Sequence, residues 1–210
     1  MTDADITGYR HTQAGLNHSH EYLLPAVQRL LDEQRQPPTT RRLFELGCGN
    51  GSVAHELTRR GWDVTGVDPS EEGIKQARAA YPGLKLQNGS AYDDLASQYG
   101  QFPVVMSLEV VEHVYAPRNY ARTIFELLSG GGTAILSTPY HGYWKNLALA
   151  LTGRMDQHFT ALWDHGHIKF WSMDTLGELL REAGFVDVRF ERVGRVPPLA
   201  KSMIAIARKP

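Results

Sequence analysis

One segment, residues 43–51, constrains the fold of this chain more than any other. It reads LFELGCGNG, a short apolar run followed by glycines at positions 47, 49 and 51. Glycine lets the backbone adopt positive φ and lets a ligand lie against the main chain without a Cβ in the way. Ser52 then begins a helix with apolar residues at positions 53, 54 and 57. The segment therefore predicts a strand, a ligand-binding loop and a helix in succession.

A second apolar run, residues 62–68, ends in a carboxylate. It reads WDVTGVD, and Asp68 is its last residue. An acid at the end of the second strand of such a unit is placed to accept hydrogen bonds from the two hydroxyls of a ribose. The alternative interpretation of Asp68 is a simple helix cap, because Pro69 and Ser70 open the next helical segment.

Other glycine loops fit the sequence less well. A phosphate-binding P-loop ends in Gly-Lys-Ser or Gly-Lys-Thr, whereas this loop ends in Asn50, Gly51 and Ser52 and has no lysine. The nicotinamide fingerprint is G-x-G-x-x-G, and here each glycine is followed by the next after one residue. A purely structural glycine turn is the remaining alternative.

Composition limits the class of protein. The 210 residues suffice for one α/β domain covering 1–210, and the net charge of −1 gives no reason to expect nucleic-acid binding. Cys48 is the only cysteine, so an internal disulfide is excluded and we expect a reducing, cytoplasmic compartment. The N-terminus lacks the apolar core of a signal peptide, and no run of about 18 apolar residues predicts a membrane span.

Hydrophobic periodicity predicts strands that alternate with helices. We expect strands at 42–46, 62–68, 84–87, 102–108, 133–137, 185–192 and 201–208, and helices at 18–36, 52–60, 70–81, 92–99, 117–128 and 174–183. This order predicts an α/β fold: a Rossmann-like, seven-stranded, mostly parallel sheet with helices on both faces and an antiparallel last strand. Residues 1–36 would form a cap arm and helix, and the aromatic insert 140–170, after strand five, a substrate lid.

Two motifs together resemble a known family. Residues 45–51 resemble motif I of the class I S-adenosylmethionine (SAM) dependent methyltransferases, and residues 107–114, SLEVVEHV, resemble motif IV of small-molecule O-methyltransferases of the ubiquinone-biosynthesis type. The resemblance implies SAM as cofactor, S-adenosylhomocysteine (SAH) as product, and methyl transfer to a hydroxyl of a small hydrophobic or aromatic molecule. The alternatives are methylation of a carboxylate, amine or sugar in secondary metabolism, a non-catalytic SAM-binding sensor, and, remotely, a nicotinamide oxidoreductase.

The resemblance implies a set of cofactor-binding residues in which the glycines carry the methionine part, Asp68 the ribose, and Pro69 and Ser70 the adenine. The set is Glu45, Gly47, Cys48, Gly49, Asn50, Gly51, Asp68, Pro69, Ser70, Ser90, Ala91, Ser107, Leu108 and Glu109. Two positions depart from the family pattern. Ser90 stands where an acid often meets the adenine amino group, and Pro103 where an aspartate is usual.

The acceptor side offers candidate bases. Histidine titrates near neutral pH, so His113, His141 and His167 are the candidate catalytic residues. His165 lies two residues before His167, and in an extended segment the two side chains would point the same way.

A metal and a membrane contact are the other open points. On a helix, Glu109, Glu112 and His113 would share one face and the resemblance makes Mg²⁺ possible there, but we expect no metal and a role for Glu112 and His113 in orienting the backbone. Residues 140–151 suit either peripheral membrane contact or a packing helix. The sequence leaves the oligomeric state open.

Overall fold

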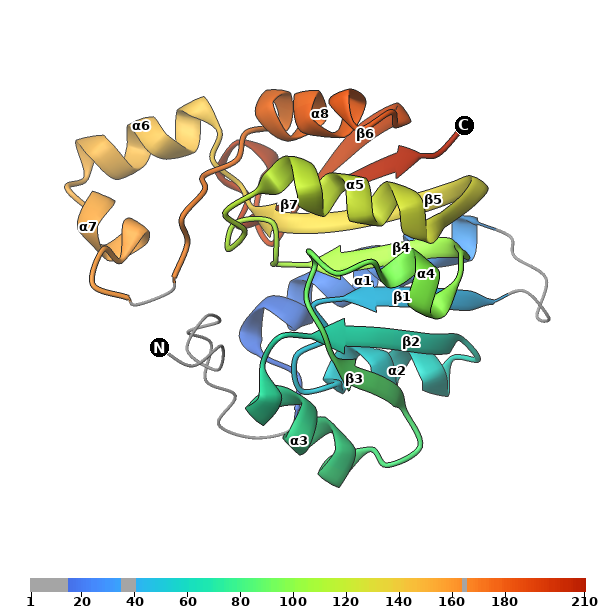
Figure 1. Ribbon diagram of the computed structural model, residues 1–210. Coiled ribbons are helices and arrows are strands. Elements are labelled where there is room, and N and C mark those ends of the chain that lie inside the picture. Colours follow the sequence, from blue (N-terminus) through green and yellow to red (C-terminus); the bar gives the residue numbers. More distant parts are fainter. Residues whose placement is uncertain (1–14, 35–40, 164–165) are drawn as a thin grey trace.

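The computed structural model describes residues 15–34, 41–163 and 166–210. Over these residues the strands form one seven-stranded sheet in the order β3-β2-β1-β4-β5-β7-β6 (Figure 1). The five strands from β3 to β5 are parallel to their neighbours, whereas β7 is antiparallel to both β5 and β6. The predicted fold class and the antiparallel last strand are therefore confirmed.

The strands are β1 (Arg42–Leu46), β2 (Asp63–Asp68), β3 (Lys85–Asn88), β4 (Phe102–Leu108), β5 (Leu128–Pro139), β6 (Val186–Val193) and β7 (Ser202–Arg208). The helices are α1 (His18–Glu33), α2 (Ser52–Arg59), α3 (Glu71–Ala80), α4 (Leu95–Tyr99), α5 (Pro117–Leu127), α6 (Tyr143–Leu151), α7 (Met155–Phe159) and α8 (Met173–Glu182), with a 3-10 turn η3 (Pro197–Leu199).

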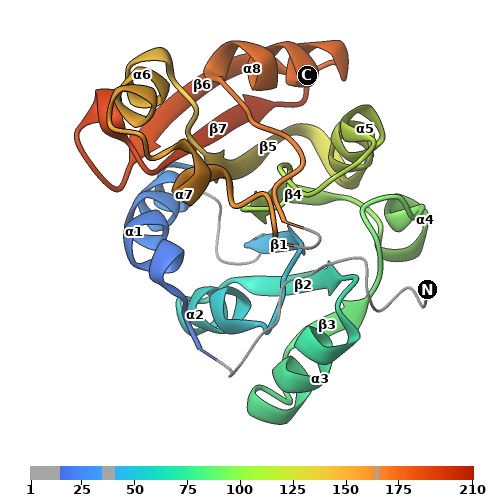
Figure 2. The same cartoon turned by 90° about the vertical axis from the view of Figure 1, so that its left-hand side faces the viewer.

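Two apolar cores fill the space between the sheet and its helices. One includes Leu30 of α1, Leu57 of α2 and Ile74 of α3. The other includes Leu95 of α4 and Ile124 of α5, together with apolar residues of α8. Figure 2 looks onto the edge where the parallel strands end and shows α1 and α2 on one side of the sheet and α4 and α5 on the other. Helices cover both faces, as the sequence predicts.

The strand β5 is longer than its apolar run indicates. The run predicts a strand at 133–137, but β5 follows directly on α5 and contains the three glycines 130–132. Its pairing with β4 shifts register between Phe102 and Val104, and Gly131 has φ +77°. Such a bulge explains why a glycine-rich stretch, which signals a loop, is paired as a strand here.

The strand order reverses between β1 and β4, and ligands of open α/β sheets bind past the carboxyl ends of the strands at this point. In Figure 1 the insert that carries α6 and α7 extends beyond the same edge. Much of the predicted N-terminal arm, residues 1–14, lies outside the described residues, as do 35–36 and His165. Among the helices that are described, none has the length and apolar character needed to cross a membrane.

Candidate functional site

The glycine loop joins β1 to α2 with three left-handed residues. Gly47, Gly49 and Gly51 have φ of +86°, +51° and +75°. The amide of Gly47 donates to the carbonyl oxygen of Val67 at 2.8 Å, which ties the loop to β2. A Cβ on Gly47 would lie 2.4 Å from Cγ2 of Val110. The loop therefore requires glycine both for its backbone conformation and for the contact with the residue after Glu109.

Asp68, at the end of β2, holds the loop in place. Its Oδ2 accepts a hydrogen bond from the amide of Gly49, and its Oδ1 accepts one from the amide of Ser70, both at 2.8 Å. The N-cap of α3 is Ser70, whose Oγ accepts from the amide of Gly73. Asp68 is therefore not the helix cap itself. A carboxylate oxygen has two lone pairs and can accept from two donors.

Glu45 lies deep beside the loop. Within the described residues its Oε2 is buried and has no hydrogen-bond partner. Burial, and then the carboxylate of Asp68, raise the pKa of Glu45 to about 8. Burial also raises the pKa of the Cys48 thiol well above its ordinary value, so this thiol stays protonated at neutral pH. A buried carboxyl oxygen without a donor is where a bound cation or ammonium would be stabilised.

Two more of the predicted cofactor residues, Asn50 and Ser107, have defined local partners. Oδ1 of Asn50 accepts from the amide of Ser52 at 3.2 Å. Oγ of Ser107 is buried and donates to the carbonyl of Leu46 at 2.7 Å, which joins the ends of β4 and β1.

The turn after β3 contains a carboxylate that the sequence motifs did not indicate. The amide of Ser90 donates to Oδ2 of Asp93 at 2.7 Å, and the Asp93 side chain is exposed. An acid three residues after Ser90 is the signal that could have identified it.

The prediction of a helix that carries Glu109, Glu112 and His113 on one face is wrong. Residues 109–116 form bends and turns, and Glu109 has φ +55°. Its amide donates to the carbonyl of Ser137 at 3.1 Å, so a contact with β5 replaces the local helical bond.

The carboxylate of Glu109 is held by two buried serines. Oε1 accepts from Oγ of Ser137 at 2.8 Å and Oε2 from Oγ of Ser202 at 3.3 Å. The hydroxyl of Tyr22 lies 3.2 Å from Oγ of Ser202, which connects α1 to the same group. Burial raises the pKa of Glu109 to about 7, while the two serine hydrogen bonds and the charge of Lys145 lower it.

A different set of three residues is close enough together to bind a metal ion. Possible ligand atoms of Glu112, His113 and His167 lie within 4.8 Å of one another. Neither carboxyl oxygen of Glu112 has a hydrogen-bond partner among the described residues, and burial raises its pKa well above the ordinary value. Nδ1 of His113 lies 3.1 Å from the carbonyl oxygen of Gly166. Mg²⁺ prefers an all-oxygen, near-octahedral set, which one carboxylate and two imidazoles do not supply. The donor set does not fit Mg²⁺.

A cavity of about 640 Å³ lies beyond the ends of β4 and β5, under α6 and α7. Glu109, His141 and His167 reach it, and His113 is not among its lining residues. Burial lowers the pKa of His141 and of His167 to about 4 in each case, so both imidazoles are neutral at pH 7.

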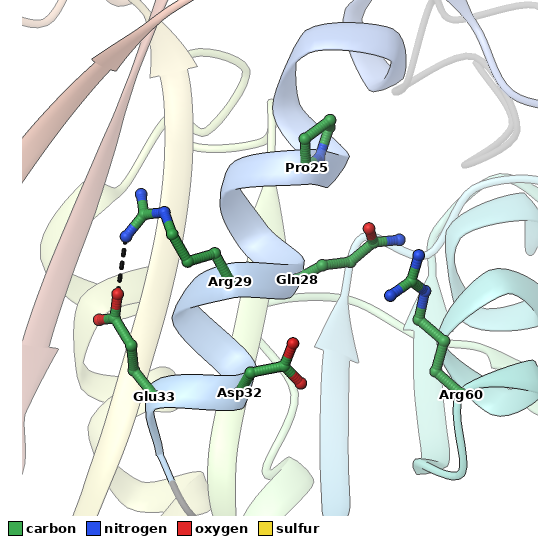
Figure 3. Close-up of a pocket in the computed structure, with 6 residues that line it drawn as sticks. All are labelled: Pro25, Gln28, Arg29, Asp32, Glu33 and Arg60. Carbon is green, nitrogen blue, oxygen red and sulfur yellow. Dashed lines mark hydrogen bonds and ion pairs between the residues drawn. The ribbon is translucent and has the colours of Figure 1, made fainter.

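A second depression, also of about 640 Å³, lies on the outer side of α1 (Figure 3). Its lining consists of residues from one stretch of α1 together with Arg60. Arg29 and Glu33 form an exposed ion pair at 2.7 Å beside it. Arg60 follows α2 at the amino-terminal side of β2, away from the strand ends. The glycine loop, Asp68 and Glu109 do not contribute to this depression, so it lies apart from the candidate site.

The strand order, the glycine loop and Asp68 define a Rossmann-like methyltransferase fold. Residues 13–189 match the family model described as a methyltransferase domain, and the chain therefore belongs to that family. This confirms the predicted class, a methyltransferase.

The chain is similar to curated relatives named ubiquinone biosynthesis O-methyltransferase. The Ruegeria pomeroyi protein is 36% identical over 151 residues, which is 70% of this chain and 60% of that protein. The Caulobacter sp. protein is 42% identical over 123 residues, 57% of this chain and 48% of the relative. The matches thus span about half to three fifths of these relatives.

Solved structures have the same fold. A SAM dependent methyltransferase from Archaeoglobus fulgidus superposes with a TM-score of 0.65 at 17% identity, covering 89% of this chain and 93% of that one. One from Mesorhizobium loti gives a TM-score of 0.64 at 21% identity, covering 88% and 98%.

Proposed function

We propose that the protein transfers the methyl group of SAM to a hydroxyl of a small aromatic or hydrophobic molecule bound in the cavity under α6 and α7. One observation carries the proposal: Val110 lies against Gly47 of the glycine loop, and its neighbour Glu109 lines the cavity. The cofactor loop and the acceptor cavity therefore meet at two consecutive residues. The O-methyltransferase names of the curated relatives support the same chemistry.

The loop residues suit the parts of SAM. The glycines offer a main chain without side chains, and Asp68 at the end of β2 is placed to accept hydrogen bonds from the ribose hydroxyls. Oε2 of Glu45, which has no hydrogen-bond partner among the described residues, suits the methionine ammonium. SAM supplies an activated methyl, so the protein contributes mainly proximity and orientation. In this proposal the turn 88–93 binds the adenine. The carboxylate of Asp93 accepts from the adenine amino group, because position 90 is a serine and not the acid that is usual there.

A hydroxyl acceptor must lose a proton. We propose that Glu109, first predicted as a cofactor-binding residue, is the base, because its side chain lines the cavity. A base works best when its pKa is near the working pH. Glu109, with a pKa of about 7, meets this condition, whereas His141 and His167, with pKa values of about 4, hold a proton weakly. All three side chains reach the cavity. The catalytic roles first predicted for His113, His141 and His167 stay predictions.

The alternatives differ in what they require. Methylation of a carboxylate needs no base, so replacement of Glu109 would leave that reaction intact. A SAM-binding sensor would bind SAM and SAH and transfer no methyl group. No step of the proposed reaction uses Mg²⁺, because the donor set of Glu112, His113 and His167 does not fit that ion.

Methyl transfer from radiolabelled SAM tests the proposal directly. The protein is incubated with hydroxylated aromatics, with their carboxylic acid analogues that lack the hydroxyl, and with the matching amines, and SAH and the products are measured by mass spectrometry. We expect methyl ethers. Methyl esters or N-methyl products as the main products, or tight SAH binding without transfer to any acceptor, would overturn the proposal.

The insert 140–170 serves, in the same proposal, as the lid over the acceptor. No residue of α6 is buried, and Tyr143, Trp144 and Leu151 are 73%, 63% and 78% exposed. This apolar exposure supports the predicted peripheral membrane contact through 140–151, which stays a prediction.

A further inference from the structure

Four cationic side chains from the described part of the chain line the cavity. Lys145 comes from α6 and Arg154 from the turn before α7. Arg195 and Lys201 come from the connection between β6 and β7. Among the described lining residues Glu109 supplies the only carboxylate. The whole chain has a net charge of −1, so this concentration of positive charge belongs to the cavity and not to the composition.

The side chains of the two lysines contact groups that are not carboxylates. Within the described residues none of the four forms an ion pair. Nζ of Lys201 lies 2.8 Å from Nε2 of His18 and 5.0 Å from the ring centre of Tyr22. Nζ of Lys145 donates to the carbonyl oxygen of Lys201 at 3.2 Å.

The cations repel one another. Burial, and then the positive charge of Arg195, lower the pKa of Lys145 to about 8, against the opposing effect of Glu109. Like charges gathered in a concave, partly desolvated site raise the local concentration of a ligand of opposite charge. The repulsion is relieved when an anion binds, and a neutral ligand would leave it in place.

We propose that the methyl acceptor carries a carboxylate or a phosphate in addition to its reacting hydroxyl, and that Arg154 and Arg195 bind this anion at the mouth of the cavity. Both arginines are exposed, whereas Glu109 lies further inside, so the acceptor would enter with its hydroxyl first. Guanidinium groups bind carboxylates and phosphates through paired hydrogen bonds. The inference rests on the proposed function and narrows its acceptor to an acidic hydroxylated molecule.

A binding experiment that needs no turnover tests the anion site. The SAH-loaded protein is titrated by calorimetry with 3-hydroxybenzoate, with 3-hydroxyphenylphosphonate and with the neutral 3-hydroxybenzamide. We expect at least one acid to bind about tenfold or more tightly than the amide, because charge-assisted hydrogen bonds are the strong ones. The preferred acid identifies carboxylate or phosphate, and the preference should shrink as salt is added.

Charge-neutralising variants locate the site. Arg195→Gln and Arg154→Gln should each reduce the preference for the acid about fivefold and leave the affinity for the amide unchanged. Arg195→Lys keeps the positive charge but loses the planar guanidinium group, so it should retain part of the preference for the acid. Arg122→Gln, at an exposed position of α5 away from the cavity, is the matched control and should change nothing.

The failures of the two proposals are distinguishable. Equal affinity for the acids and the amide, or an acid preference that survives in Arg154→Gln and Arg195→Gln, overturns the anion site. If the acids bind selectively but no hydroxylated compound receives a methyl group from labelled SAM, the anion site stands and the proposed methyl transfer falls.

Discussion

The amide of Gly49 donates a hydrogen bond of 2.8 Å to Oδ2 of Asp68, so the middle of the glycine loop is fastened to the end of β2. This bond joins the two halves of the predicted cofactor site through groups of the protein itself. Such an internal contact reduces the conformational entropy that a loop loses on binding a ligand. The same carboxylate also orients the amide that begins α3, at Ser70.

We predict that Asp68→Asn weakens SAM binding about tenfold or more, since hydrogen bonds to a charged group contribute about 1.5–3 kcal/mol. The asparagine amide group has one oxygen, while two backbone N–H groups and the ribose all need acceptors. Calorimetric titration with SAM measures the effect.

The control for this variant is Asp63→Asn, at the opposite end of the same strand, where the carboxylate forms an exposed ion pair with Lys85 at 2.7 Å. Such a pair contributes about 0–1 kcal/mol to stability, and SAM affinity should not change. Equal SAM affinity for folded Asp68→Asn and the wild type would refute the ribose role.

We predict that Gly47→Ala loses stability and SAM affinity together. Alanine at φ +86° is strained by about 1–2 kcal/mol, and its Cβ would lie 2.4 Å from Cγ2 of Val110. Gly61→Ala places a Cβ at the same φ, +86°, with Nη1 of Arg41 at 3.9 Å as its nearest described contact, so it measures the backbone strain without a close contact.

Denaturant unfolding compares Gly47→Ala, Gly61→Ala and the double variant Gly47→Ala with Val110→Ala. We expect the double variant to be less destabilised than the sum of its single variants, because the contact is removed. Equal destabilisation at positions 47 and 61, with SAM affinity intact in both, would contradict the close approach.

We predict that Glu109→Gln lowers kcat about 100-fold or more and leaves SAM affinity within about threefold, because a positioned base contributes about 10²–10⁴. In the wild type kcat should rise with pH through about 7, where Glu109 ionises. This rising limb of the pH profile of kcat should be absent from the variant.

Ser202→Ala gives a graded version of the same test. It removes a hydrogen bond that stabilises the ionised carboxylate, so the limb should move to higher pH. A limb that stays near pH 7 in Glu109→Gln assigns the proton to another group.

We predict that the free energy of unfolding falls between pH 4.5 and about 8 in part because of Glu45. Its pKa is raised from 4.5 to about 8 on folding, so over this range the native state keeps a proton that the unfolded state has lost. The stabilisation is full below pH 4.5 and is lost as the pH rises through 8, at most about 1.4 kcal/mol per pH unit.

Glu45→Gln should flatten this dependence in denaturation curves at pH 5, 7 and 9, while Glu72→Gln at an exposed position of α3 should keep the wild-type slope. Parallel curves for Glu45→Gln and the wild type would show that this carboxyl is not the titrating group.

Sequence patterns predicted the part of the site whose residues lie close together in the sequence. The strand, loop and helix at 42–59 and the acid at 68 follow from periodicity and glycine spacing within one βαβ unit. The spacing of Glu109, Glu112 and His113 is equally helical, yet the amide of Glu109 is bound by Ser137 of β5 instead of by its own turn. A contact between segments overrides the local preference there.

The acceptor cavity could not be predicted for the same reason. Tyr22 and Ser202 meet beside Glu109 although they lie at opposite ends of the chain. The four cations come from α6, the turn before α7 and the β6–β7 connection, and only the folded chain brings them to one cavity.

The most direct test is a crystal structure of the protein with SAH. We predict that the nucleoside lies along residues 47–51, with its ribose hydroxyls within hydrogen-bond distance of Asp68 and its sulfur facing the cavity beside Glu109. SAH bound elsewhere, or with its sulfur turned away from that cavity, would contradict the account.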